Sequence, residues 1–443
     1  MPTLDSLYPA HLKTLRARTD QALRATGFES VAIHSGRTWM QFLDDQPYPF
    51  KVNPHFKAWV PLTDAADSWI LYQPGQRLRL IFLQPDDYWH QPPALPSGYW
   101  ASHFSIEVIR DAAEAKAHVA RLGNCALIGE WQSEYADWGF AEGNPKQLLD
   151  HLHYHRAIKT GYELECMRLA SVRGARGHEA AEAAFRSGAS EYEIHLAFLR
   201  GTGHTDNELP YPDIVALNTH AAVLHYQHLD RQAPQQLRSF LIDAGAEVAG
   251  YASDITRTYS NDGGEFQALI DGMDRLQLEL CAQVRPGVDY ASIHLDAHRR
   301  IAELLRASDV ISMNADDAVA SGLSGVFFPH GVGHLLGLQV HDVAGFTINL
   351  EGKQKPRPAG HPYLRLTRTL EPGFVVTIEP GLYFIESLLA QARKGPHAQQ
   401  INWKQVERFK PYGGIRIEDD VACTQDEPEN LTRAAFAAIR SGR

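Results

Sequence analysis

Alternation of apolar and polar positions divides the first part of the chain into short strands and amphipathic helices. SVAIHSG at 30–36 and CALIGE at 125–130 predict strands, and WILYQPGQRLRLIFLQP at 69–85 predicts a hairpin around Pro74 and Gly75. A helix ending at Gly27 is indicated near the start, and an alanine-rich helix at 110–123. These elements predict a compact α/β domain over residues 1–157.

The pattern changes after the histidine-rich stretch HLHYHRAIKTG, and we place a domain boundary there. Two capping boxes, Thr160 with Glu163 and Ser190 with Glu193, predict helix starts, and further helices are expected at about 263–284 and 289–306. Segments 238–260, 374–384 and 413–424 are rich in β-branched residues and glycine, which predicts mainly antiparallel strands. The fold class is therefore α+β, with a second domain over residues 158–443.

Composition narrows the class of protein. The 443 residues are 44% hydrophobic and 21% charged, as in globular proteins, and their net charge is −11, which disfavours nucleic-acid binding. Four widely spaced cysteines favour reduced thiols and a cytoplasmic location. The first residues lack the apolar block of a signal peptide, and no stretch is apolar enough to span a bilayer, so we expect no membrane association.

Two aspartates in segment 238–260 are candidate metal ligands. Asp243 and Asp254 are placed symmetrically about Val248 and Ala249, so a hairpin turn there would set them opposite each other on adjacent strands. Two such carboxylates repel each other unless a cation lies between them. The alternative is a pair of solvent-facing aspartates beside a turn, and this segment alone leaves both open.

The segment FFPHGVGHLLGLQVHD brings three histidines together with three glycines. His330, His334 and His341 alternate with glycines too closely for a helix, and the HExxH pattern is absent, since His330 to His334 reads HGVGH, with Val332 in the middle and no glutamate. The segment predicts a loop or bent strand that a substrate or an ion can approach closely.

Two strand patterns carry further carboxylates. The period of two places Thr377 and Glu379 on one face in VVTIEPG, and Arg416 and Glu418 on one face in GGIRIEDD. Each strand taken alone is more simply an amphipathic edge strand with a solvated face, because an unpaired buried charge is costly.

Together these residues resemble a known metal site. Asp243, Asp254, His334, Glu379 and Glu418, with the motifs IDAGAEVAGYASDITRT, HGVGHLLGLQVHD, TIEPGLY and GGIRIED, resemble the creatinase/aminopeptidase family, which has the pita-bread fold. Among its members the sequence is most similar to bacterial Xaa-Pro dipeptidases, or prolidases, including those described as organophosphorus acid anhydrolases. The similarity extends to DQPYPFKVNPHFKAWVP and covers nearly the whole chain.

The resemblance implies a dinuclear hydrolase that cleaves Xaa-Pro dipeptides. It assigns Asp243 to one divalent ion, His334 and Glu379 to the other, and Asp254 and Glu418 to both. The oxygen-rich donor set favours Mn²⁺, with Co²⁺ as an alternative. By similarity a hydroxide between the ions is the nucleophile, and Glu379 transfers its proton toward the prolyl nitrogen. The same chemistry implies a side activity on organophosphorus compounds.

The resemblance also assigns accessory roles. His341 and His225 would contact the substrate or stabilise the oxyanion, His330 would line the pocket, and Arg416 would orient Glu418. Arg365 would bind the substrate carboxylate. Positions that would shape the pockets are Tyr211, Leu224, Tyr290 and Leu364. A homodimer is implied, in which Asp45 and Trp89 would reach the partner's site.

Other functions remain to be separated. A non-catalytic pita-bread binding protein is disfavoured because all five ligands are present. Aminopeptidase P is the main alternative, since it has nearly the same ligands and acts on longer peptides; the N-terminal domain disfavours methionine aminopeptidase, and metal-free creatinase lacks the full ligand set. His294 and His298 have the spacing of a metal clip on one helix, but we expect no function for them without further nearby ligands. His151, His153 and His155 are interpreted as part of a solvated linker.

Overall fold

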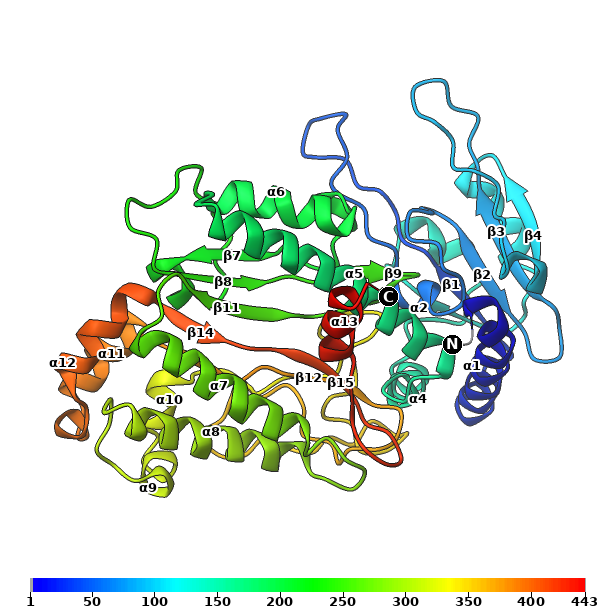
Figure 1. Ribbon diagram of the computed structural model, residues 1–443. Helices are drawn as coiled ribbons and strands as arrows, with labels where there is room; N and C mark the ends of the chain where they lie inside the picture. Colours follow the sequence, from blue (N-terminus) through cyan, green and yellow to red (C-terminus); the bar gives the residue numbers. More distant parts are fainter. Residues whose placement is uncertain (1–2, 443) are drawn as a thin grey trace.

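A six-stranded mixed sheet forms the centre of the N-terminal domain in the computed structural model, which describes residues 3–442 (Figure 1). In the order β4-β3-β2-β1-β5-β6, its strands are β1 (Ser30–His34), β2 (Trp69–Tyr72), β3 (Leu78–Leu83), β4 (Phe104–Ile109), β5 (Cys125–Ile128) and β6 (Glu142–Gly143). The expected hairpin is confirmed, because β2 and β3 pair antiparallel around Gly75, whose φ is +77°. The helices are α1 (Leu4–Thr26), α2 (Pro54–Lys57) and α3 (Ala115–Val119).

The histidine-rich stretch is not a solvated linker. Residues Lys146–Arg156 form helix α4, which packs against α1, and Leu148 on its inner face is fully buried. His153 stacks on His55 with 5.1 Å between the ring centroids. The linker interpretation is therefore wrong: Leu148, Leu149 and Leu152 give this segment an apolar face that a helix can bury.

Two helices lie along one side of the first sheet of the C-terminal domain (Figure 1). They are α5 (Gly161–Arg186) and α6 (Glu191–Thr202), and both start at the expected capping boxes. The sheet has the order β11-β8-β7 and is antiparallel throughout; its strands are β7 (Ile214–Leu217), β8 (Ser239–Asp243) and β11 (Thr256–Ser260). A small hairpin of β9 (Glu247–Val248) and β10 (Tyr251–Ala252) extends from it.

The other strands of this domain form two further antiparallel sheets, in the orders β12-β15-β16 and β13-β14, with α7 and α8 on their outer side (Figure 1). The strands are β12 (Val375–Ile378), β13 (Gly381–Tyr383), β14 (Gly414–Arg416), β15 (Asp419–Ala422) and β16 (Glu429–Asn430). The helices are α7 (Glu265–Cys281), α8 (Tyr290–Ala307), α9 (Ala315–Ala320), α10 (Ser324–Phe327), α11 (Glu386–Lys394), α12 (Trp403–Phe409) and α13 (Leu431–Arg440). Antiparallel sheets covered by helices confirm the α+β prediction.

Backbone bridges join the sheets where the candidate ligands lie. Thr256 on β11 pairs with Glu418 in the segment between β14 and β15, and Leu335 pairs with Val376 on β12. The chain therefore brings β8, β11, β12 and β14 around one region, although these strands are far apart in sequence.

A buried ion cluster holds the domains together. Asp342, from the histidine loop, accepts hydrogen bonds from Arg156 at the end of α4 and from Lys159, the second over 3.0 Å. The Asp342 side chain is only 1% exposed. The boundary near residue 157 stays a prediction, and none of the helices within residues 3–442 is long and apolar enough to cross a membrane.

Candidate metal centre

A cavity of about 830 Å³ opens where the strands of the C-terminal domain meet. Most of the residues that the sequence singled out line it: Leu224, His225, Asp243, Asp254, His330, His334, His341, Arg365, Glu379, Arg416 and Glu418. All five predicted ligands are in this set. Their convergence from four separate segments is a result that no single motif could establish.

The two aspartates lie together, but not directly opposite each other as expected. The turn falls at Ala249 and Gly250, both with positive φ, so the partner of Asp243 on β11 is Thr256. Asp254 precedes β11, and the hydroxyl of Tyr211 lies 2.9 Å from Asp243 and 2.5 Å from Asp254. The expected register is wrong because the turn centre is shifted, yet the carboxylates still share one neighbour.

His334 presents one ring nitrogen to the carboxylates. Its Nδ1 lies 3.0 Å from the carbonyl oxygen of Leu335, which can only accept, so Nδ1 carries a proton and Nε2 is the nitrogen that faces the carboxylates. Nε2 lies 3.4 Å from Asp254 and 3.6 Å from Glu379. Gly333 makes this approach possible, because a Cβ there would stand 2.1 Å from the carbonyl oxygen of Thr377.

Burial makes ionisation of the carboxylates unfavourable in the absence of cations. It raises the pKa of Glu379 to about 7 and, together with Asp254, Glu379 and Asp243, raises the pKa of Glu418 well above its usual range. The pKa of Asp254 is lowered despite burial, through its contact with His334. Ligand atoms of Asp254, His334 and Glu418 lie within 4.8 Å of one another. A set of four carboxylates and one imidazole, three of them buried and two half-buried, fits hard divalent cations, which would restore the charged forms.

The strands that carry the later ligands are not amphipathic edges with a solvated face. Every residue of β12 is buried, and Arg416 and Glu418 are 4% and 2% exposed. Arg416 donates hydrogen bonds to Asp243 over 2.7 Å and to the hydroxyl of Tyr383 over 2.8 Å. The solvated-face alternative is wrong because these polar groups pair with one another across the cavity wall.

The other predicted pocket residues divide into three groups. His225, His341 and Arg365 are exposed side chains of the cavity wall, and the ring centroid of His341 lies 4.5 Å from that of His334. Tyr290 and Leu364 are fully buried behind the wall, where the Tyr290 hydroxyl donates to the Thr377 carbonyl over 2.6 Å. The third group is Asp45 and Trp89, which are exposed in the N-terminal domain and do not line the cavity.

Sequence reasoning missed several residues that support the site. Tyr383 bridges His330 and Arg416 through its hydroxyl, and Asp420 accepts the backbone N–H of Asp254. Arg357 adds a second cationic side chain to the cavity wall beside Arg365. Tyr383 and Asp420 lie in the motifs TIEPGLY and GGIRIEDD, but their roles depend on partners from other segments, which no sequence pattern identifies.

Two family models together span most of the chain. Residues 165–425 match metallopeptidase family M24, and residues 6–154 match the Xaa-Pro dipeptidase N-terminal domain. Curated relatives match over 99% of both chains: Xaa-Pro dipeptidases of Xanthomonas euvesicatoria pv. vesicatoria, 54% identical, and of Xanthomonas campestris pv. campestris, 56% identical, each over 439 residues.

Solved structures confirm the two-domain pita-bread architecture. The aminopeptidase PepP of Pseudomonas aeruginosa superposes with a TM-score of 0.71 at 23% identity, covering 97% of this chain and 99% of that one. Aminopeptidase P of Escherichia coli with the inhibitor Pro-Leu gives 0.70 at 20% identity, covering 96% and 99%. At these identities the likeness concerns the fold alone. The models and the curated relatives show more: the chain is an enzyme that belongs to metallopeptidase family M24, with the two-domain organisation of its Xaa-Pro dipeptidases.

Proposed function

We propose that this protein is a dinuclear Xaa-Pro dipeptidase. The observation that carries the proposal is the convergence of Asp243, Asp254, His334, Glu379 and Glu418 on one cavity. Its support outside the structure is the set of relatives named Xaa-Pro dipeptidase, which match from end to end at 54–56% identity. The substrate class therefore rests on the relatives, and the reaction chemistry rests on the cavity.

The chain would hold two divalent ions in this cavity. Asp243 would bind one, His334 and Glu379 the other, and Asp254 and Glu418 both. Oxygen donors outnumber the single imidazole, which favours Mn²⁺, with Co²⁺ as the alternative. Two such ions would supply a nucleophilic hydroxide at neutral pH and polarise the scissile carbonyl.

Proton transfer is assigned to Glu379. Its carboxylate faces the cavity, with oxygens 3.6 Å from both His330 and His334. Cleavage of an Xaa-Pro bond requires a proton on the prolyl nitrogen before that amine can leave. Glu379 would take the proton from the attacking water and deliver it there.

Two histidines are assigned to the substrate carbonyl. His341 and His225 both line the cavity, and partial desolvation of the His341 ring against the cavity wall, together with the neighbouring His334, lowers the pKa of His341 to about 3, which keeps its imidazole uncharged. An uncharged imidazole can still donate one N–H to the oxygen on which charge develops during attack. Leu224, beside His225, and His330 would form the remaining walls of the substrate pocket.

Arg365 is assigned to the carboxylate of the substrate proline. Arg365 is an exposed residue that lines the same cavity as the proposed ligands, so a short peptide bound there would place its C-terminus against this side chain. The planar guanidinium can bind a carboxylate through two parallel hydrogen bonds. A tripeptide has no carboxylate at this position, so Arg365 would select dipeptides.

A homodimer in the cytoplasm is part of this proposal. Two long loops of the N-terminal domain project beyond its sheet (Figure 1). They expose large apolar side chains: Phe42 at 86%, Leu43 at 90%, Tyr88 at 87% and Trp89 at 77%. Apolar surface of this kind is typical of interfaces. Asp45 and Trp89 would then lie near the active site of the partner subunit.

One assay separates this function from its alternatives. Xaa-Pro dipeptides, Xaa-Pro-Yaa tripeptides and Met-Ala-X peptides are compared with Mn²⁺ present, after chelation, and in an Asp254→Asn variant. We expect dipeptide cleavage that is lost on chelation and restored by Mn²⁺ or Co²⁺, and reduced metal occupancy in Asp254→Asn. Preference for tripeptides would favour aminopeptidase P, and full activity of the metal-free protein would exclude the dinuclear mechanism.

A further inference from the structure

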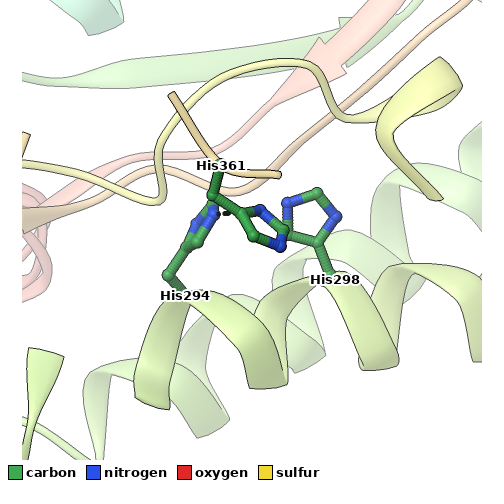
Figure 2. Close-up of side chains that lie close together, drawn as sticks. All are labelled: His294, His298 and His361. Carbon is green, nitrogen blue, oxygen red and sulfur yellow. Dashed lines mark hydrogen bonds between the residues drawn. The ribbon is translucent and has the colours of Figure 1, made fainter. Parts of the chain in front are cut away.

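Three histidines meet outside the cavity described above (Figure 2). His294 and His298 project from neighbouring turns of α8, and His361 reaches them from the loop before Leu364. Nε2 of His294 lies 2.9 Å from Nδ1 of His361, and one ligand nitrogen from each ring lies within 4.8 Å of the other two. The third ligand that was missing from the helix pair in the sequence is supplied by a distant loop, so our expectation of no further nearby ligand is wrong.

The polar contacts of the cluster are incomplete. Nδ1 of His298 lies 3.0 Å from the hydroxyl of Ser324, and Nδ1 of His294 has no hydrogen-bond partner although that residue is only 1% exposed. Burial lowers the pKa of His294 to about 2 and of His298 to about 3, so both rings are uncharged at neutral pH. Uncharged imidazoles are the form that binds metals, and the proton shared between Nε2 of His294 and Nδ1 of His361 would move to the other nitrogen of its own ring when an ion binds.

We propose that His294, His298 and His361 form a third metal site of this subunit, which binds a divalent transition ion of the Zn²⁺, Ni²⁺ or Cu²⁺ class. Three imidazoles without a carboxylate suit these ions better than Mn²⁺, for which the oxygen-rich cavity is the better site. The inference goes beyond the proposed function, because it needs neither the dipeptide substrate nor the dinuclear centre.

One pair of ring nitrogens is already near the spacing of two ligands on one ion, and the nitrogen of His298 lies within 4.8 Å of both. Tetrahedral coordination with zinc–nitrogen bonds of about 2.1 Å places two ligand nitrogens about 3.4 Å apart, so the nitrogens of His294 and His361 must separate by about 0.5 Å. Nδ1 of His298 can donate its proton to Ser324, which directs Nε2 toward the centre. A hollow of about 560 Å³ beside the rings leaves room for water as a fourth ligand.

The location predicts what the ion would do. Pro362 and Tyr363, next to His361, line both this hollow and the proposed catalytic cavity. An ion bound to His361 and to α8 would fix the loop that continues into Arg365. The site would therefore hold the loop that carries the proposed carboxylate-binding arginine.

Zinc binding to the Mn²⁺-loaded full-length protein tests this site. Crystals are soaked in ZnCl₂ and anomalous differences are collected at the zinc edge, while the zinc affinity in solution is measured by competition with a chromophoric chelator. We expect a zinc peak among the three imidazoles and one zinc ion per chain in addition to the manganese. In His298→Gln and His361→Gln the affinity of this ion should fall by at least tenfold.

His397→Gln is the matched control, because His397 is a half-buried histidine outside the cluster, and its zinc affinity should equal that of wild type. Circular dichroism spectra of all variants verify that each is folded. The proposal is overturned if zinc enters only the manganese cavity, or if folded His298→Gln and His361→Gln bind zinc as wild type does. Neither result depends on peptide cleavage, so the proposed function could stand or fail separately.

Discussion

The hydroxyl of Thr256 donates a 2.6 Å hydrogen bond to Oε2 of Glu418, and both residues are buried. This contact crosses from β11 to the segment after β14, so it fixes a proposed bridging carboxylate against the opposite sheet. We had expected Arg416 to orient Glu418, but the hydrogen bonds of Arg416 go to Asp243, Tyr383 and Thr256. Thr256 is therefore the residue that positions Glu418 directly.

Replacement of Thr256 by valine should weaken metal binding. Loss of a hydrogen bond to a ligating carboxylate typically lowers metal affinity by about 10–100-fold. We expect the Mn²⁺ affinity of Thr256→Val to fall by this factor, measured by calorimetric titration of protein from which the metal has been removed with a chelator. Thr256→Ser keeps the hydroxyl and should bind like wild type. Thr258→Val removes a hydroxyl that contacts the Arg416 backbone instead; an equal loss in that variant would contradict a specific role for Thr256.

The ion pairs of Asp342 should make the free energy of unfolding depend on pH in the acidic range. Burial alone would raise its pKa, but Arg156 and Lys159 lower it to about 2, below the ordinary value of 3.8. A carboxyl with a depressed folded pKa contributes stability above its unfolded pKa, and this is lost as pH falls through the folded value. The contribution should be about 2 kcal/mol at neutral pH and disappear between about pH 4 and 2.

Urea unfolding of Asp342→Asn and wild type at several pH values measures this effect. The difference in the free energy of unfolding should be largest at neutral pH and shrink toward pH 2. Asp64→Asn changes an exposed carboxyl of the N-terminal domain and serves as the control. A difference that stays constant with pH would show that Asp342 does not hold the domains through its charge.

Organophosphorus hydrolysis should accompany peptide cleavage. A nucleophile generated between two cations can attack tetrahedral phosphorus, because the charge on oxygen is stabilised in the same way as at a carbonyl. We expect slow, metal-dependent hydrolysis of organophosphorus esters or fluorides, and Asp254→Asn should lose both activities together. Robust peptide turnover without any phosphorus chemistry across several such compounds would exclude the side activity.

The exposed loops of the N-terminal domain should mediate dimerisation. A charge at Phe42, which is 86% exposed, would be buried unpaired in such an interface, so Phe42→Asp should shift the protein toward monomer in sedimentation experiments. Leu278→Asp is the control, because Leu278 is an exposed leucine of α7, outside these loops. A fully active wild-type monomer at assay concentration would contradict the proposed contribution of Asp45 and Trp89 to the partner's site.

Local patterns were sufficient for most of the helices and strands. The capping boxes at Thr160 and Ser190 are confirmed because both partners lie within one helical turn. The turn between Asp243 and Asp254 was displaced, because the symmetry of two carboxylates does not determine a register; the left-handed conformations of Ala249 and Gly250 do. The simpler expectation of a solvated face for the strands that carry Glu379 and Glu418 was also wrong. The strand sequence alone does not show that Asp243, from another segment, neutralises Arg416.

The candidate site was accessible to sequence reasoning only through family resemblance. Each carboxylate alone was compatible with a solvated strand, and the structure brings them together by pairing β11 with the segment around Glu418. The three-histidine cluster had no such resemblance to guide it. Two of its three histidines were visible as a helical spacing, and the third depends on where the loop containing His361 folds.

The most direct test of the proposed function is the effect of Arg365→Ala on two kinds of substrate. A hydrogen bond to a charged group contributes about 1.5–3 kcal/mol, so kcat/KM for Xaa-Pro should fall by about 10–150-fold. Amidated dipeptides and Xaa-Pro-Yaa tripeptides lack a carboxylate at that position and should be much less affected. The matched control is Arg365→Lys, which retains the charge at the cavity wall and should recover part of the rate. Arg368 is less suitable as a control position, because its side chain is buried away from the cavity wall. A selective loss on free dipeptides is the result we predict, and equal losses on both substrate types, or a wild type that prefers tripeptides, would contradict a dipeptidase.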